Sequence, residues 1–211
     1  MKAFLKYCAA ILALALGTAS VARADVILFN EGFQGIGGGT YLTGATVGPV
    51  FFVQGGSVDV LDGAFFPALC VAAGGSPACV DLDGSTSFGG TLSSNTFFGA
   101  GNYRLSFQLA GSQRGDVNTV TVFFGDQIVP ITLLSAAPFS NFSILATVSA
   151  VNPSRVVFFN AGGDNVGNLL DNVSLTRLEA RAVPEPSSLL LLVTALIGVG
   201  ASLRRRRNAN H

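Results

Sequence analysis

The central part of the chain lacks the residue types on which much enzyme chemistry depends. Residues 25–182 contain no lysine, histidine, methionine or tryptophan, and the only histidine of the 211-residue chain is His211. A Ser-His-Asp or Cys-His catalytic site, a histidine-ligated zinc ion and a histidine general base are therefore excluded from this region. With no recognisable nucleophile–base pair, we predict that the protein is not an enzyme, and keep an exported hydrolase as an alternative.

Positive charge is scarce between the two ends of the chain. The whole chain has 12 Lys and Arg against 12 Asp and Glu, but seven of the basic residues lie in residues 1–24 and 204–211. Residues 25–182 keep five arginines against eleven acidic residues, a net charge of −6. Because nucleic-acid affinity depends on neutralising phosphates, this acidic composition argues against nucleic acid as a partner.

Residues 1–24 are typical of a secretory signal peptide. Lys2 and Lys6 supply a positively charged start, and residues 8–16 form an apolar segment that is short for a membrane span. We expect signal peptidase to cleave after residue 24, and an uncleaved anchor is the alternative. The pattern that the peptidase recognises comprises Ala22, Ala24 and Asp25.

Residues 183–211 contain three parts in a fixed order. A proline-containing motif is followed by the apolar residues 187–203 and then by four arginines. Seventeen helical residues span about 25 Å, enough for a thin hydrocarbon core, so we predict a transmembrane helix over 187–203. The arginines should act as a cytoplasmic stop signal, which places residues 25–182 across the membrane. The motif is Val183, Pro184, Glu185 and Pro186, and the arginines are Arg204, Arg205, Arg206 and Arg207.

This C-terminal pattern, from Val183 to Arg207, resembles the PEP-CTERM sorting signal of Gram-negative bacteria. The resemblance implies processing by an exosortase, a membrane enzyme that cleaves near the motif, and a link to exopolysaccharide and biofilm formation. It also implies export across the inner membrane and transient anchoring by the C-terminal helix. We expect a final place in the outer envelope or extracellular matrix. A plain membrane anchor with a chance Pro-Glu-Pro is the alternative.

Residues 25–182 have the composition of an all-β domain. They hold 23 glycines and 16 of the 17 phenylalanines, whereas a disordered linker would lack the aromatic residues. Apolar and polar residues alternate most clearly in 103–109, 120–124 and 142–148, as in strands with one buried face. The pattern predicts a single jelly-roll-like antiparallel β-sandwich. Further candidate strands are 26–29, 50–53, 57–61, 79–82, 127–132, 155–160 and 171–178.

The mature chain keeps two cysteines, Cys70 and Cys79, because Cys8 leaves with the signal peptide. They bracket a turn-forming segment, and an oxidising compartment favours a disulfide between them. A catalytic thiol pair is the alternative, although the spacing is not Cys-x-x-Cys.

A second resemblance rests on five short segments of the domain, residues 30–34, 56–60, 80–84, 103–111 and 170–175. They resemble segments of galactose-binding-domain-like sandwiches, a group that includes carbohydrate-binding modules. In related sandwiches, an acidic residue of the opening segment and an Asp of the closing strand help to bind a structural calcium ion. The matching positions here are Gln34 and Asp171, so the resemblance implies a calcium site at these residues. Gln34 departs from the pattern as a neutral donor, although Glu31 lies nearby, and solvent-facing turn residues are the alternative.

Two short acidic motifs receive structural interpretations. Asp81 and Asp83 have the spacing that places two carboxylates on one face of a strand, but glycosidases hold theirs about 5–10 Å apart across a cleft. Because Asp-Gly often ends a strand, we interpret the pair as the end of a strand. Arg114-Gly115-Asp116 is the integrin tripeptide, which we interpret as a solvated turn.

The leading hypothesis is a non-enzymatic protein of the cell envelope or extracellular matrix, processed by signal peptidase and an exosortase. The alternative is a carbohydrate-binding module, in which an exposed face with aromatic rings and amide or carboxylate groups would hold an extracellular polysaccharide. Apart from the calcium site, we predict no cofactor.

Overall fold

The computed structural model describes residues 24–86 and 88–179, together with residues 194, 196–198, 200 and 205. The chain divides into two compact units, of which Asp25–Glu179 is one. The sorting motif 183–186, residue Ala22 and three of the four terminal arginines lie outside the described residues. The isolated positions from 194 onward are helical, and most of the expected transmembrane segment 187–203 is likewise outside the description. Within the residues described, no helix is both long enough and apolar enough to cross a membrane.

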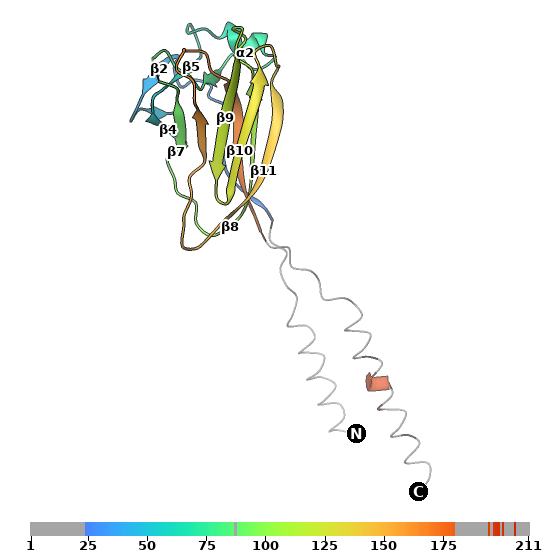
Figure 1. Ribbon diagram of the computed structural model, residues 1–211. Coiled ribbons are helices and arrows are strands. Elements are labelled where there is room, and N and C mark those ends of the chain that lie inside the picture. Colours follow the sequence, from blue (N-terminus) through green and yellow to red (C-terminus); the bar gives the residue numbers. More distant parts are fainter. Residues whose placement is uncertain are drawn as a thin grey trace. The chain divides into compact units, whose positions relative to one another are not determined.

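Asp25–Glu179 forms two antiparallel sheets that face each other (Figure 1). The seven-stranded sheet has the order β11-β8-β13-β6-β5-β2, and β1 also pairs with β13. The six-stranded sheet has the order β10-β9-β12-β7-β4-β3. The predicted all-β sandwich is therefore confirmed. The first sheet comprises β1 (Val26–Glu31), β2 (Gly39–Leu42), β5 (Ser57–Leu61), β6 (Cys79–Asp81), β8 (Gly101–Ala110), β11 (Ser140–Val148) and β13 (Leu169–Leu178). The second comprises β3 (Thr46–Val47), β4 (Phe51–Gly55), β7 (Thr91–Ser94), β9 (Val117–Phe124), β10 (Gln127–Leu134) and β12 (Val157–Asn160).

Each of the ten candidate strands corresponds to a strand of the structure, but three strands and one short helix were not predicted from the sequence. The helix α2 (Ala68–Ala72) is a single turn, and β2, β3 and β7 are two to four residues long. In β7 the consecutive residues Leu92, Ser93 and Ser94 are all buried, so the strand shows no alternation of polar and apolar side chains. Its burial is determined by the neighbouring strands β4 and β12, so the sequence of the strand alone does not predict it.

Aromatic rings fill the space between the sheets. The alternation in β8 correctly predicts its buried face, which includes Tyr103 and Phe107. The Phe107 ring meets the Phe158 ring of the opposite sheet edge to face, with 5.2 Å between centroids. Phe158 also lies 6.4 Å from the Phe51 ring on its own sheet. Edge-to-face contacts of this kind add to the stabilisation from apolar burial.

The predicted disulfide between Cys70 and Cys79 is confirmed, with the two Cα atoms 5.9 Å apart. It joins α2 to the start of β6, and both cysteines are buried in a small apolar cluster with Leu61 and Leu169. A closed loop of this length contributes about 3 kcal/mol in the chain-entropy model. The bridge therefore fixes a turn that the sheets alone do not hold.

The first and last described residues of the domain lie together. Val26 is opposite Arg177 in the β1–β13 pair, and the Glu179 amide donates to Asp25 Oδ1 at 3.2 Å. Both ends of the domain therefore emerge at one end of the sandwich, and α2 is at the other end (Figure 1).

Candidate functional site

Four of the five Phe-Phe pairs lie at the six-stranded sheet, and the fifth, Phe65-Phe66, precedes α2. Three of the four lie on β4, β9 and β12, where the alternation of side chains along a strand places one ring in the core and the other on the outside. The remaining pair, Phe97-Phe98, follows β7, and Phe98 forms an isolated bridge with Ser154. The buried members are Phe51, Phe98, Phe124 and Phe158. The outer members are Phe52, Phe97, Phe123 and Phe159, which we call the aromatic face.

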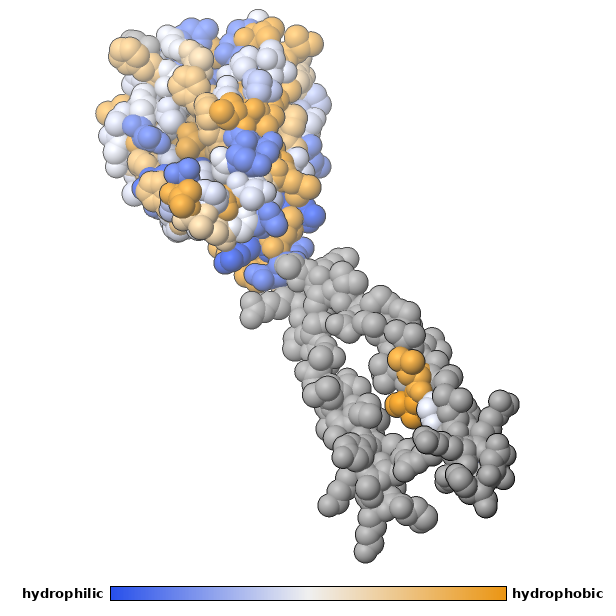
Figure 2. Space-filling model, turned by 60° about the horizontal axis from the view of Figure 1, so that its bottom comes forward, coloured by the Kyte–Doolittle hydropathy of each residue, from blue (hydrophilic) through white to orange (hydrophobic). Residues whose placement is uncertain are grey.

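The strand register places three rings of the aromatic face on one surface. Phe123 of β9 is opposite Val157 of β12, Val157 is opposite Ser93 of β7, and Ser93 is opposite Phe52 of β4. Phe159 lies two residues beyond Val157 and therefore on the same side of the sheet. Hydrophobic patches do lie beside hydrophilic ones on the surface of the sandwich (Figure 2). Sequence analysis missed this face, although the repeated Phe-Phe pairs were a signal for it.

Arg155 links the fourth ring to the sheet. Its guanidinium carbon lies 4.1 Å from the centroid of Phe97 and 4.9 Å from that of Phe52, so the cation is layered between the two rings. Cation–π attraction of this kind orients both partners. The Arg155 Nε atom is buried and has no hydrogen-bond partner in the described part of the chain. The rings, rather than a carboxylate, therefore hold this arginine.

The outer face of the seven-stranded sheet has a different chemistry. The Gln108 side-chain amide donates to Asn141 Oδ1 at 3.0 Å, and the Asn172 amide donates to Gln108 Oε1 at 2.8 Å. These amides form a ladder across β11, β8 and β13 and satisfy one another. The aromatic groups and the amide groups therefore lie on opposite outer faces of the sandwich. The carbohydrate-binding hypothesis had placed both kinds of group on one face.

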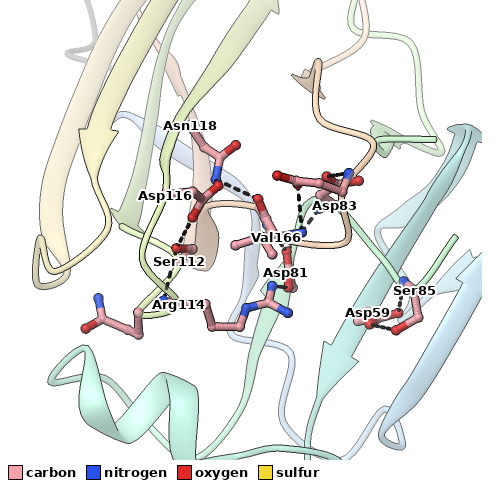
Figure 3. Close-up of polar contacts among 12 residues, drawn as sticks. Asp59, Asp81, Asp83, Ser85, Ser112, Arg114, Asp116, Asn118 and Val166 are labelled. Carbon is pink, nitrogen blue, oxygen red and sulfur yellow. Dashed lines mark hydrogen bonds and ion pairs between the residues drawn. The ribbon is translucent and has the colours of Figure 1, made fainter. Parts of the chain in front are cut away.

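Asp81 and Asp83 are buried and bind the amides of neighbouring loops (Figure 3). Asp81 Oδ1 accepts hydrogen bonds from the amides of Asp83 and Gly167, both at 3.0 Å, and Asp81 Oδ2 pairs with the Arg114 guanidinium. Burial raises the pKa of Asp81 to about 7, although the charge of Arg114 opposes this shift. Strand β6 ends at Asp81, which agrees with our interpretation of the pair as the end of a strand.

Arg114 and Gly115 lie in an exposed bend, in agreement with our interpretation of Arg114-Gly115-Asp116 as a solvated turn, but both charged side chains of the motif have partners. Arg114 is committed to the buried Asp81, and Asp116 accepts hydrogen bonds from the Ser112 hydroxyl at 2.5 Å and from the Asn118 amide (Figure 3). The motif belongs to a polar network that includes Asp81, which lies 33 residues away in the sequence at the end of β6. Neither charged group of the motif is therefore free for recognition.

The structure brings Gln34 and Asp171 together through Ser76. The Gln34 side-chain amide donates to Ser76 Oγ at 3.1 Å, and the Ser76 hydroxyl donates to Asp171 Oδ2 at 3.0 Å. Burial raises the pKa of Asp171, and the nearby negative charge of Glu31 raises it further. Asp171 is buried and is not a solvent-facing turn residue, whereas Gln34 is exposed.

These residues supply two carboxylates and neutral oxygens, a hard donor set that suits calcium. An open hollow of about 650 Å³ adjoins them and is lined by Glu31, Gln34 and Tyr41. Among the residues described, no three His, Cys, Asp or Glu side chains lie close enough to hold a metal ion by themselves. A calcium ion here would therefore also need neutral oxygen ligands.

Several solved structures of carbohydrate-binding modules are similar to this chain. The CBM22-1 xylan-binding domain of Xyn10C from Paenibacillus barcinonensis shares 14% identity and a TM-score of 0.48, over 76% of this chain and 99% of that one. TmCBM61, solved with β-1,4-galactotriose, shares 16% identity and a TM-score of 0.42, over 63% and 91%. A family 35 module from Clostridium thermocellum shares 15% identity and a TM-score of 0.36, over 72% and 98%.

No curated protein matches the chain. Residues 182–207 match the family model of the PEP-CTERM protein-sorting motif. The resemblance noted in the C-terminal sequence is thereby confirmed over nearly the same residues. The chain therefore carries a PEP-CTERM sorting signal, which implies an exported protein, anchored transiently by its C-terminus and processed by an exosortase.

Proposed function

We propose that the sandwich, after release from its C-terminal signal, resides in the outer envelope or extracellular matrix and binds a neutral glycan on the aromatic face. The observation that supports this proposal is the placement of Phe52, Phe123 and Phe159 together on the outside of the six-stranded sheet. The protein acts as a binding component of an exopolysaccharide or biofilm matrix and performs no catalysis.

The aromatic face suits a sugar ring for a physical reason. A pyranose presents apolar C–H groups on its faces, and these stack on aromatic rings, while its hydroxyls bind polar groups at the rim. Phe123 and Phe159 are more than one-third exposed, which is unusual for paired rings in a soluble sheet unless a ligand covers them. Threonine hydroxyls on β9 and β10, those of Thr119 and Thr132, lie 2.8 Å apart and border the face.

Charge argues for a neutral glycan. Residues 25–182 carry a net charge of −6, which repels a polyanionic chain over several ångströms. Arg155 lies over the rings of Phe52 and Phe97, where it can orient one sugar hydroxyl. Its single positive charge does not offset the net negative charge of the domain.

Replacing Phe159 or Phe97 with alanine should weaken glycan binding about tenfold each, because a lost ring contact of roughly 1.4 kcal/mol corresponds to that factor. Affinity gels containing neutral bacterial exopolysaccharide would measure the effect through the mobility of the protein. The matched control is Leu145→Ala, which removes a 61%-exposed apolar side chain from the outer face of the other sheet. Equal mobility of all three variants would contradict the proposed face. Hydrolysis of a glycan panel would favour the exported hydrolase instead.

Replacing Glu185 with alanine should block release in a host that contains an exosortase, because the residue lies within the matched sorting motif. We expect the variant to accumulate in the inner-membrane fraction as a folded protein, detected by fractionation and limited proteolysis. Ser187→Ala, two residues away, serves as the control and should be released normally. Release of the Glu185→Ala protein at the normal rate would rule out this sorting route.

The proposal includes a structural calcium ion held by Asp171, Gln34 and Glu31. Two carboxylates close enough for one to raise the pKa of the other gain stability when a cation lies between them. Bound calcium would supply that positive charge. The ion would then strengthen the attachment of the disulfide loop to β13, which the hydrogen bond between Ser76 and Asp171 already provides.

A further inference from the structure

Two buried side chains at the end of β6 and β12 carry polar atoms that have no partner in the described part of the chain. Asp83 is 0% exposed and its Oδ1 atom accepts no hydrogen bond. Asn160 is 1% exposed, and neither its Oδ1 nor its Nδ2 atom has a partner. Each such buried group costs about 1–3 kcal/mol, and a charged one costs more, so an ion or a water molecule is the usual explanation.

Asp83 and Asn160 converge on the backbone of Gly162. A Cβ atom added to Gly162 would lie 2.0 Å from Asp83 Oδ2 and 2.7 Å from Asn160 Nδ2. The glycine is therefore required by the close approach of both side chains. The loop between β12 and β13 thus closes over the carboxylate and the amide together.

The hydrogen bonds of Asp83 leave one oxygen unused. Asp83 Oδ2 accepts from the amides of Gly163 and Asp164 at 2.7 and 3.3 Å, whereas Oδ1 accepts nothing. Burial raises the pKa of Asp83, and the negative charge of the neighbouring Asp164 raises it further. The nearby Arg114 is already paired with Asp81. Two acidic groups therefore share this site without a cation from the described residues.

The donor set distinguishes a cation from a water molecule. A water can complete hydrogen bonds, but it does not compensate the charge of the buried Asp83 carboxylate and of the exposed Asp164 carboxylate beside it. A monovalent ion would leave one negative charge uncompensated. Magnesium usually keeps several of its own waters, whereas calcium accepts six to eight protein oxygens in flexible geometry, including amide and carboxylate oxygens.

We propose that Asp83, Asn160 and Asp164 bind a calcium ion that pins the β12–β13 loop to the end of β6. The site is separate from the one at Gln34 and Asp171, because it uses other loops and other residues. Extracellular calcium modules bind with dissociation constants of about 10⁻⁴–10⁻³ M, which suits an exported protein. The ion would thus lock the loop only after the chain has left the cytoplasm.

The experiment uses the processed protein purified from its host, with Asp171→Asn introduced to remove the other calcium site. Calorimetric titration with CaCl₂ should still show one saturable site, and 5 mM Ca²⁺ should raise Tm by about 3 °C over EDTA. MgCl₂ at the same concentration should have a much smaller effect. Absence of saturable calcium binding would overturn the proposal.

Asp164→Asn is the decisive variant, because Asp164 is exposed and its replacement keeps the backbone amides that hold Asp83. In the Asp171→Asn protein it should weaken calcium binding at least tenfold without lowering Tm in EDTA, because it also removes a negative charge beside Asp83. Asp126→Asn removes an acid from another exposed turn and should leave calcium binding unchanged. Asp83→Asn should abolish calcium binding, and if that variant does not fold, Asp164→Asn still decides. Equal affinity of the Asp164→Asn and Asp126→Asn proteins would contradict the proposed site.

Discussion

The domain should be about 4 kcal/mol less stable at pH 8 than near pH 4 because of a single buried carboxyl group. Burial raises the pKa of Asp81 from 3.8 in the unfolded chain to about 7 in the folded protein. Below pH 3.8 the group is protonated in both states and its contribution to stability is fully present. As the pH rises toward 7, the unfolded chain releases the proton while the folded protein retains it, so stability is lost. A difference of about three pKa units corresponds to about 4 kcal/mol.

Urea denaturation in EDTA at several pH values between 4 and 8 measures this dependence. Asp81→Asn should flatten most of the profile, because the amide cannot titrate yet still accepts hydrogen bonds from the amides of Asp83 and Gly167. Arg114→Met should extend the loss of stability to higher pH, since it removes the charge that opposes the rise in pKa. The pKa values of Asp83 and Asp171 are also raised by burial, so their contributions have the same sign. A profile that rises with pH, or an unchanged slope in Asp81→Asn, would contradict this account.

The strands were predictable wherever one face is apolar and the other polar. In β8 and β11 the alternation places Leu105 and Ile144 inside and Arg104 and Ser143 outside, as the sequence pattern predicts. In β7 it fails, because Ser93 is buried on the outer side beneath its neighbours. Burial there is determined by strands that are distant in sequence, so no local pattern reports it.

The polar sites depend on contacts between distant residues, which a single sequence does not reveal. Asp81 meets Arg114, and Asp83 meets the loop that contains Asp164, only because the strand order places β6 beside β13. The meeting of Gln34 and Asp171 was predicted from a family resemblance rather than from spacing. The sorting signal, by contrast, is a local motif, and for that reason the sequence was sufficient to identify it.

In a Phe-Phe pair on a strand, the sequence does not say which ring is buried, whereas the structure assigns one ring to the core and the other to the outer face. The strand containing Phe158 and Phe159 has no polar residue to mark its outer side, so its sequence does not say which ring is buried. The register decides it, because Phe158 is opposite the buried Leu92 and Val122, while Phe159 is opposite threonines on the outer face. One ring thus belongs to the core, and its neighbour belongs to the proposed binding face.

Phe158→Ala should therefore lower the free energy of unfolding by about 3–5 kcal/mol, whereas Phe159→Ala should lower it by less than about 1 kcal/mol. Phe158 is fully buried and its ring contacts Phe107 across the sheets, so its loss leaves a cavity. Phe159 is 40% exposed and leaves none. Glycan affinity at a temperature where both variants are folded should show the opposite order, with Phe159→Ala the weaker binder. Urea denaturation and affinity gels on the same two proteins measure both quantities. Equal stability losses would mean that the register of β12 is wrong, and equal glycan affinities would remove Phe159 from the binding face.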